Sequence, residues 1–314
     1  MNNWAQLYAG LMNLPNVTIR QLEYLIAVAE TGSLTTAATR CHVSQAAISL
    51  ALTEVERALG LRLVIRSPRR GASLTAAGKQ VLAGARRVVG AMSDLGVEAR
   101  GLGRDVSGTL VVGCYGPIAP FHLPAAIATF ESDHPDVSVR FVEGSLPEIQ
   151  DHLLDGRCEI AFLYEQDVYP AITFRTLYDQ QPAILLPGSH RLAGRESLSL
   201  EELADEPFIL LDVPPSERYF RAVFESAHLA MVPAHRARSF ELARSLVARG
   251  LGYSMTVQQP ALSHSYEGLA VIALPLREKA PSTPVVMGWP AGGPLTHRAQ
   301  AFLDHCERLF AEGR

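Results

Sequence analysis

Residues 32–60 read GSLTTAATRCHVSQAAISLALTEVERALG and contain two short amphipathic segments on either side of a tight turn. Ser33 stands where it can cap the first segment, whose apolar residues are Leu34, Ala37, Ala38 and Cys41. Ser44 can cap the second, whose apolar residues recur at helical spacing as Ile48, Leu52, Val55 and Leu59 before Gly60. Two short helices joined by a tight turn are the pattern of a helix-turn-helix.

The sequence on both sides of this pair completes a small domain. Before it, apolar residues over 19–29 predict a helix that ends at Gly32. After it, residues 61–66 predict a strand, residues 68–71 a turn, and a return strand reaches Leu74. This hairpin is a wing, and at or near its tip stand Arg66, Arg69 and Arg70. Arginines on a protruding wing suit phosphate or minor-groove contacts; a solvated surface turn is the alternative.

The exposed face of the second helix of the helix-turn-helix suits contact with DNA bases. It presents small or hydrogen-bonding residues, and its first turns carry no charge. Such a face can approach base edges in the major groove while phosphate lies at the helix N-terminus. Packing against another protein element is the alternative. The candidate DNA contacts are Ser33, Thr35, Thr36, Ser44, Gln45, Ala46, Ser49, Leu50, Thr53, Arg66, Arg69 and Arg70.

A long helix is predicted from Thr75, which can cap it, to about Leu102. Apolar residues recur along it at alternating spacings of four and three: Val81, Ala85, Val88, Met92, Leu95, Ala99 and Leu102. Heptads of this kind form the seam of a coiled coil, so the helix is expected to pair with a second copy of the chain. An amphipathic helix lying on its own domain is the alternative. A hinge is predicted over residues 101–108.

Beyond residue 108 the pattern changes to alternating strands and helices. The predicted strands are 110–113, 137–142, 158–163, 183–186, 208–211, 251–255 and 285–288. The predicted helices are 117–133, 146–155, one from Ser216, 239–249 and one that ends near Ala311. This alternation predicts an α/β domain with a largely parallel sheet.

Composition and charge narrow the class of protein. The 314 residues suggest two or three units, and their 48% apolar content suits globular folding. Residues 1–105 carry 12 basic against 7 acidic side chains, a net +5, while residues 106–314 carry 16 against 25, a net −9. Only the N-terminal part is therefore expected to meet a polyanion. Neither a membrane-spanning run nor a secretory signal is recognised, which favours a cytoplasmic protein with no membrane partner.

The sequence carries none of the common motifs of enzymes and metal proteins. No Gly-rich phosphate loop, HExxH or G-x-S-x-G stands in it, so we expect no catalytic residue, metal site or cofactor. Its four cysteines, Cys41, Cys114, Cys158 and Cys306, form no CxxC, which is typical of a reducing cytoplasm. A solute-binding protein and a cysteine-based redox sensor are the alternative functions, because Cys114 and Cys158 both fall near strand ends.

Residues 20–78, RQLEYLIAVAETGSLTTAATRCHVSQAAISLALTEVERALGLRLVIRSPRRGASLTAAG, resemble the LysR-type transcriptional regulators in order and spacing. The resemblance implies a winged helix-turn-helix over 17–75, a dimerising linker helix over 76–103 and an effector-binding domain over 104–314. Residues 1–16 of the sequence are expected to form a disordered extension before these domains. The resemblance implies a sequence-specific regulator of transcription that binds double-stranded DNA. Its further partners are then a second copy, in a dimer or a dimer of dimers, and RNA polymerase.

One departure from the family pattern affects the base contacts. The family often has Arg-Gln after the serine equivalent to Ser49, where this chain has Leu50-Ala51. Ser44, Gln45 and Ser49 are therefore better candidates for base contacts than Leu50.

The C-terminal pattern resembles the periplasmic-binding-protein-like effector domain of the same family. It implies one lobe over about 108–181 and 282–314, another over about 182–281, and a small-molecule effector between them. Strand ends and helix starts face such a cleft, and they hold Cys114, Tyr115, Gly116, Pro117, Ser145, Tyr164, Asp212, Ser216, Ser239 and Phe240. Each also has a structural reading, since serine often caps helices and cysteine and aromatic residues often lie in a core.

Overall fold

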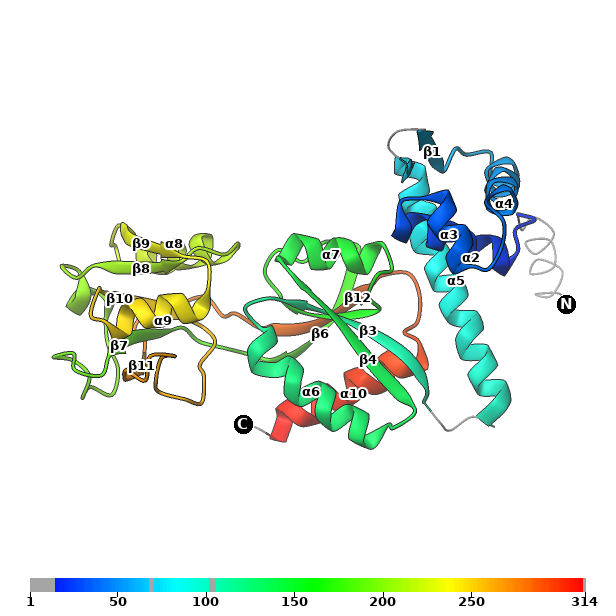
Figure 1. Ribbon diagram of the computed structural model, residues 1–314. Helices are drawn as coiled ribbons and strands as arrows, with labels where there is room; N and C mark the ends of the chain where they lie inside the picture. The colour runs from blue at the N-terminus through cyan, green and yellow to red at the C-terminus, as the bar shows by residue number, and fades with distance from the viewer. Residues whose placement is uncertain (1–14, 68–70, 102–105, 313–314) are drawn as a thin grey trace, which may run out of the picture. The chain divides into compact units, whose positions relative to one another are not determined.

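The computed structural model describes residues 15–67, 71–101 and 106–312, and it separates into two compact units (Figure 1). The first unit comprises the described residues up to 101 together with Leu154–Arg157, and the second comprises the described residues from Val106 onward without those four. Apart from Leu154–Arg157, the first unit runs from blue to cyan in Figure 1 and the second from green to red. Arg69, Arg70, Leu102 and residues 1–14 of the predicted extension lie outside the described residues.

The first unit is a winged helix-turn-helix followed by a long helix, as predicted. Its described elements are α2 (Ile19–Thr31), α3 (Leu34–Arg40), α4 (Gln45–Leu59), β1 (Val64–Ser67), β2 (Gly71–Leu74) and α5 (Ala76–Gly101). The core between the helices is apolar and closed, with Leu25, Ile48 and Leu52 fully buried. Burial of this kind stabilises the unit by roughly 1.5–3 kcal/mol for each large side chain.

Local hydrogen bonds explain where these helices begin and end. The Thr18 side chain accepts a bond from the Gln21 backbone N–H, and the Gln21 side chain accepts one from the Thr18 N–H, which forms a capping box. The Ser33 and Ser44 side chains accept from the third N–H of α3 and α4. Gly32 ends α2 with φ at 63°, a left-handed conformation that glycine adopts without a steric penalty.

The first wing strand begins at Val64, later than the predicted residue 61. The Glu56 carboxylate on α4 accepts hydrogen bonds from the N–H groups of Leu63 and Val64, at 2.8 and 3.0 Å. Because these bonds hold the chain against α4, pairing with β2 starts only at Val64, opposite Leu74.

The second unit contains two five-stranded sheets, one in each lobe. The first sheet comprises β3 (Gly108–Tyr115), β4 (Val137–Gly144), β5 (Ile160–Tyr164), β6 (Ile172–Tyr178) and β12 (Val285–Pro290). The second comprises β7 (Ala183–Pro187), β8 (Phe208–Leu211), β9 (Pro233–Ala237), β10 (Tyr253–Thr256) and β11 (Val271–Pro275). The described helices are α6 (Ala119–Asp133), α7 (Leu146–Leu154), η1 (Leu200–Leu203), α8 (Ser216–Ser226), α9 (Phe240–Ala248) and α10 (His297–Glu312).

The prediction of a largely parallel sheet is wrong, because both sheets are mixed. The strand orders are β4-β3-β5-β12-β6 and β9-β8-β10-β7-β11, and each sheet has two parallel and two antiparallel pairings. The chain crosses between the lobes after β6 and again after β11. The first strand after each crossing, β7 or β12, enters its sheet antiparallel to both neighbours.

Three strands escaped the sequence prediction, and all three lie at sheet edges. These are β6, β9 and β11. An edge strand meets solvent on one side, so its sequence lacks the continuous apolar run of a central strand. β9, for example, is PAHRA with three exposed residues, whereas all four residues of β8, FILL, are buried.

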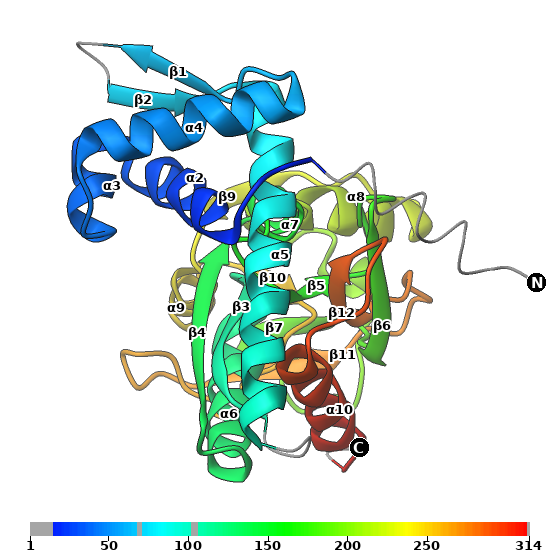
Figure 2. The ribbon, with the colours of Figure 1, turned by 90° about the vertical axis from the view of Figure 1, so that its right-hand side faces the viewer.

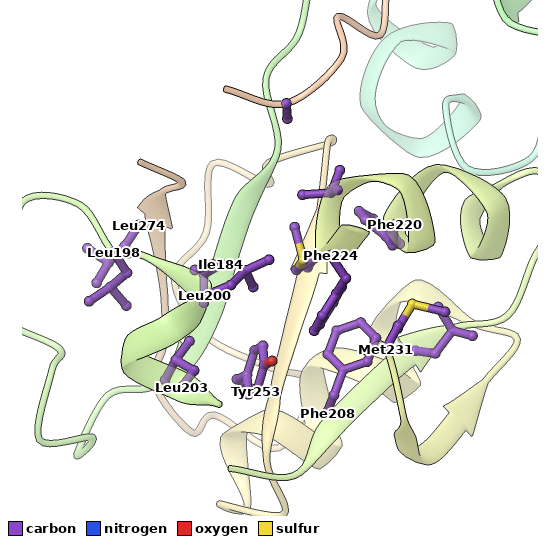
Figure 3. Close-up of a cluster of buried hydrophobic side chains, with 14 of the residues drawn as sticks. Ile184, Leu198, Leu200, Leu203, Phe208, Phe220, Phe224, Met231, Tyr253 and Leu274 are labelled. Atoms are coloured by element: carbon purple, nitrogen blue, oxygen red, sulfur yellow. The ribbon is translucent and has the colours of Figure 1, made fainter. Parts of the chain in front are cut away.

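The sheet of the second lobe is covered on both faces. Ile184, Leu210 and Tyr253 point to one face, where they pack with residues of η1 and α8, as Figure 3 shows for part of this cluster. Leu185 and Ile209 point to the other face and pack with α9. In the first lobe α6 and α10 lie side by side along the sheet, and α7 lies on its other side (Figure 1).

Candidate functional site

The outer face of α4 forms the candidate DNA interface in the first unit. Figure 2 shows α4 beside the hairpin of β1 and β2. Gln45, Ala46 and Thr53 are exposed on this face, Ser49 is half-buried, and Leu50 is 62% exposed. The face is therefore accessible and carries no charged side chain of its own over its first turns.

Side chains from neighbouring elements organise the polar groups of this face. The Thr35 hydroxyl donates to the Gln45 side-chain oxygen at 3.2 Å. Arg66, on β1, donates to the Ser49 hydroxyl at 2.8 Å and to the Thr53 hydroxyl at 3.1 Å. The face is thus a set of hydrogen-bonding groups held in place before any ligand binds.

The start of α4 leaves donors available for an anion. The Ser44 hydroxyl accepts the Ala47 N–H at 3.1 Å, so Ser44 satisfies one of the first N–H groups of the helix. The N–H groups of Gln45 and Ala46 make no backbone bond within the described residues. Unpaired N–H groups at a helix N-terminus favour a phosphate. Ser33 has the same capping role in α3, with Thr36 as its partner.

The predicted seam on α5 divides into two parts. Ala85 is 3% exposed and packs in the core of its own head, which removes it from the set that can lie between two copies. Val81 is half-buried against the same core. Further along, three apolar side chains remain about half exposed: Val88 at 47%, Met92 at 52% and Leu95 at 55%. The Ala99 side chain lies outside the described part of the chain.

A cavity of about 1490 Å³ lies between the two lobes of the second unit. Five of the ten predicted effector contacts line it: Gly116, Pro117, Ser145, Ser239 and Phe240. They come from the ends of β3 and β4 in one lobe and from the start of α9 in the other. The rule that strand ends and helix starts face such a cleft therefore locates its walls.

The other five predicted contacts lie behind or beside this cavity. Cys114, Tyr115 and Tyr164 are buried in the first lobe, and burial raises the pKa of both tyrosines far above the ordinary value. Asp212 forms an ion pair with Arg236 at 3.4 Å. Ser216 is the first residue of α8 and is not among the lining residues.

The two lobes touch through several specific contacts near the cavity. The Tyr115 hydroxyl donates to the Pro214 carbonyl at 2.9 Å. The Phe121 and Phe240 rings meet edge to face with centroids 5.3 Å apart. His122 Nε2 lies 3.1 Å from the Gln258 side-chain oxygen, and burial lowers the pKa of His122, so the ring is neutral at pH 7. Movement of one lobe against the other would have to break or remake these contacts.

Several lining residues were missed by sequence reasoning. Gln258 is 3% exposed, and its amide nitrogen donates to the Tyr164 hydroxyl at 3.0 Å. Arg244 is 5% exposed, pairs with Glu241 at 2.8 Å and donates to the carbonyls of Leu262 and His264. Gln258 stands just past the end of β10, so the strand-end rule could have found it; Arg244 lies inside α9 and gives no such signal.

The cysteines lie in environments that disfavour redox sensing. Cys114, Cys158 and Cys306 are at most 1% exposed, and Cys41 is half-buried. Burial raises the pKa of all three buried thiols, to about 12 for Cys158. The thiolate is the reactive form. The environment of these thiols therefore opposes the redox-sensor alternative.

We expect a thiol reagent such as Ellman's reagent to label at most one cysteine of the folded protein rapidly at pH 8. With a pKa of about 12, about one Cys158 thiol in 10,000 is ionised at that pH. Unfolding in guanidinium should expose all four cysteines as the positive control. Rapid labelling of two or more in the folded protein would contradict the buried environments and restore the redox sensor.

The described residues offer no group of three or more histidine, cysteine or acidic side chains that could hold a metal ion. No helix within the described ranges is both long and apolar enough to cross a membrane.

Comparisons with known proteins find a family match for each of the two parts of the chain. Residues 19–79 match the family described as "Bacterial regulatory helix-turn-helix protein, lysR family", and residues 103–311 match "LysR substrate binding domain". A probable hydrogen peroxide-inducible genes activator of Mycobacterium avium is 31% identical over 265 residues, which cover 82% of this chain and 84% of that protein.

Solved structures give the same picture. HinK, a LysR family transcriptional regulator from Pseudomonas aeruginosa, is 33% identical with a TM-score of 0.65, over 95% of this chain and 100% of HinK. Full-length CbnR complexed with its target DNA shares 23% identity and a TM-score of 0.55, over 94% of this chain and 100% of CbnR, which is a likeness of fold.

Proposed function

Because this chain belongs to the LysR family of transcriptional regulators, we propose which of its residues carry out the function of that family. The protein is a DNA-binding transcriptional regulator with an effector-binding domain. The observation that carries the proposal for DNA is the exposed, uncharged, hydrogen-bonding face of α4, on the second helix of the helix-turn-helix.

We propose that α4 lies in the major groove of double-stranded DNA. Gln45 and Ser49 then face base edges, and the unpaired N–H groups at the start of the helix meet a phosphate. The hydroxyls of Ser33, Thr35 and Thr36 lie at the start of α3. They supply contacts to the DNA backbone beside the contacts of α4. Arg69 and Arg70 of the wing remain predicted phosphate contacts.

Replacing Gln45 by alanine is expected to weaken binding to a specific duplex more than binding to random DNA. The specific loss should be about 1–3 kcal/mol, because a side-chain amide that contacts a base is removed. Fluorescence anisotropy with a duplex selected by the wild-type protein, and with a random duplex of equal length, measures both losses. The control is Arg57→Ala at the exposed last turn of the same helix, which should affect the two duplexes equally. Equal losses for Gln45→Ala as well would place Gln45 against the backbone.

We propose that a small-molecule effector binds in the cavity between the lobes. Its walls come from both lobes and combine the rings of Phe121 and Phe240 with polar groups, which suits a ligand with an apolar body and a few polar atoms. Arg238, exposed at the start of α9, lines the cavity and has no partner among the described residues, so it favours an anionic group. Ser239 beside it supplies a hydroxyl.

The remaining partners follow from this role. We propose that α5 pairs with α5 of a second copy through Val88, Met92 and Leu95, in a dimer or a dimer of dimers. RNA polymerase is a further proposed partner, as for a regulator that acts at promoters. A protein that works on DNA in this way is placed in the cytoplasm, and we assign it no catalytic activity.

A further inference from the structure

The guanidinium of Arg66 lies on the outer face of α4 although Arg66 belongs to the wing. One terminal nitrogen, Nη1, donates to the Ser49 hydroxyl at 2.8 Å. The other, Nη2, donates to the Thr53 hydroxyl at 3.1 Å and to the Ser49 carbonyl at 3.3 Å. Glu56 lies 3.9 Å from Nη2 and adds a weak attraction. The side chain is therefore directed toward the helix rather than outward from the hairpin.

These bonds fix what the Ser49 hydroxyl can do next. A serine hydroxyl has one hydrogen to donate and two lone pairs. Arg66 occupies a lone pair, so the hydroxyl hydrogen remains for another partner, and within the described residues no acceptor for it is found. Thr53 differs, because its hydroxyl already donates to the Ser49 carbonyl at 2.9 Å. Ser49 thus presents a donor to whatever approaches α4.

Arg66 also supplies the charge that α4 lacks. Leu50 occupies the next position after Ser49 on the exposed side, and the first turns of the helix contain no cation. The Arg66 side chain is 37% exposed, and its Nε hydrogen and one Nη1 hydrogen have no partner within the described ranges. An arginine with spare donors beside a serine hydroxyl with a free hydrogen makes a positively charged patch that is rich in donors.

We propose that Arg66 and Ser49 act together as a reading pair that selects guanine in the major groove. Guanine presents two acceptors there, O6 and N7, and is the base edge that arginine contacts most often. The guanidinium has no acceptor of its own, so it would disfavour the cytosine and adenine amino groups. The inference rests on the proposed placement of α4 in the groove. It assigns to Arg66, a residue of the wing, a base contact beside α4. The sequence alone had predicted a phosphate or minor-groove contact for this arginine.

The test is a selection of double-stranded DNA from a random library with the full-length protein and its variants. Arg66→Ala and Ser49→Ala should each lose the same guanine preference and keep the other preferred positions. Their affinity for the duplex selected by the wild-type protein should fall about tenfold or more. Replacing that guanine by 7-deazaguanine should weaken the wild-type protein but neither variant. The double variant should lose little beyond either single variant, since the two residues form one unit.

Two further variants separate charge from base reading. Arg66→Lys keeps the charge without the planar fork, so it should keep the salt dependence and still lose the guanine preference. Arg62→Ala removes another exposed arginine just before the wing and should leave every base preference unchanged. Circular dichroism and melting curves show whether each variant is folded.

Two results would overturn the pairing of Arg66 with Ser49. One is an Arg66→Ala protein that keeps the guanine preference, binds all duplexes more weakly and has a salt slope flatter by about 0.9, which makes Arg66 a phosphate contact. The other is a guanine preference that Ser49→Ala alone removes. If both Gln45→Ala and Ser49→Ala leave every base preference intact, the placement of α4 itself fails, which distinguishes that failure from the failure of the pair.

Discussion

The full-length protein carrying Val88→Asp together with Leu95→Asp is expected to lose its self-association and run as a monomer at low micromolar concentration. Both side chains are about half exposed in the single chain, so the substitutions leave the core of each head intact. In a paired α5 they would face the partner helix, and two unpaired carboxylates per chain would be buried there at a cost of several kcal/mol. Analytical ultracentrifugation over a range of concentrations measures the change.

The same variant should bind DNA far more weakly. Two heads held in one dimer engage two half-sites, and the second contact is then intramolecular. Losing the dimer should reduce affinity for a two-half-site duplex by roughly 100-fold or more, and affinity for one half-site very little.

Two aspartates placed off the seam provide the control for charge and helix propensity. Gln80→Asp with Arg87→Asp puts both aspartates at exposed positions of α5 that are not apolar seam positions of the heptad, and this protein should still associate. A Val88→Asp, Leu95→Asp protein that keeps its oligomeric mass would place the interface elsewhere on the chain.

The first unit was predictable from sequence because its determinants are local. Ser33, Ser44 and Gly32 lie within a few residues of the helix ends they set, and helical spacing identifies the buried faces. The start of β1 was not predictable, since it depends on the Glu56 carboxylate reaching the Leu63 and Val64 N–H groups. Likewise the heptad pattern could not reveal that Ala85 packs within its own head, because periodicity identifies an apolar face and not what covers it.

The second unit was predictable where strands are buried on both faces. The central strand β8, FILL, is a short apolar run, while edge strands such as β9 are half polar and resemble loops. The mixed sheet topology could not be predicted from the sequence. The antiparallel β7 and β12 arise from the path of the chain between the lobes, which no local pattern records.

The candidate sites, too, were predictable only where their determinants are local in the sequence. The strand-end rule located Ser145 and Ser239 on the cavity wall, but it could not tell that Tyr115 and Tyr164 are buried by contacts with Pro214 and Gln258 of the other lobe and do not line the cavity. The orientation of Arg66 toward Ser49 joins residues 17 positions apart through side chains alone. Contacts of this kind depend on packing between elements, which the pattern of a single sequence does not encode.

Replacing Ser239 by leucine is expected to abolish the response to an effector while leaving DNA binding without effector within about twofold of the wild-type protein. Ser239 is exposed and lines the cavity, so a leucine there fills space that the ligand needs and removes a hydroxyl. It lies in the second unit, whereas the candidate DNA contacts lie in the first. A thermal-shift screen of metabolites made or used by the products of neighbouring genes supplies the ligand. At 100 times its dissociation constant a ligand stabilises the protein by about 2.7 kcal/mol, or roughly 5–10 °C in melting temperature.

Ser239→Ala is the matched control for the helix cap. The Ser239 hydroxyl accepts the Leu242 N–H at 3.4 Å, so either substitution removes this cap and costs about 0.5–2 kcal/mol before any ligand is added. The informative quantity is therefore the shift caused by the ligand, which Ser239→Ala should largely keep and Ser239→Leu should lose. A full shift in Ser239→Leu would remove Ser239 from the site.

A DNA titration with and without the same ligand then tests whether the ligand regulates DNA binding. A ligand changes DNA affinity only if it binds one arrangement of the protein better than another, and in this fold the contacts at Tyr115, Phe121 and His122 are what a change between the lobes would alter. The wild-type protein should change its DNA affinity on adding the ligand, and Ser239→Leu should not. A ligand that stabilises the wild-type protein yet leaves its DNA affinity unchanged would show binding in the cleft without regulation.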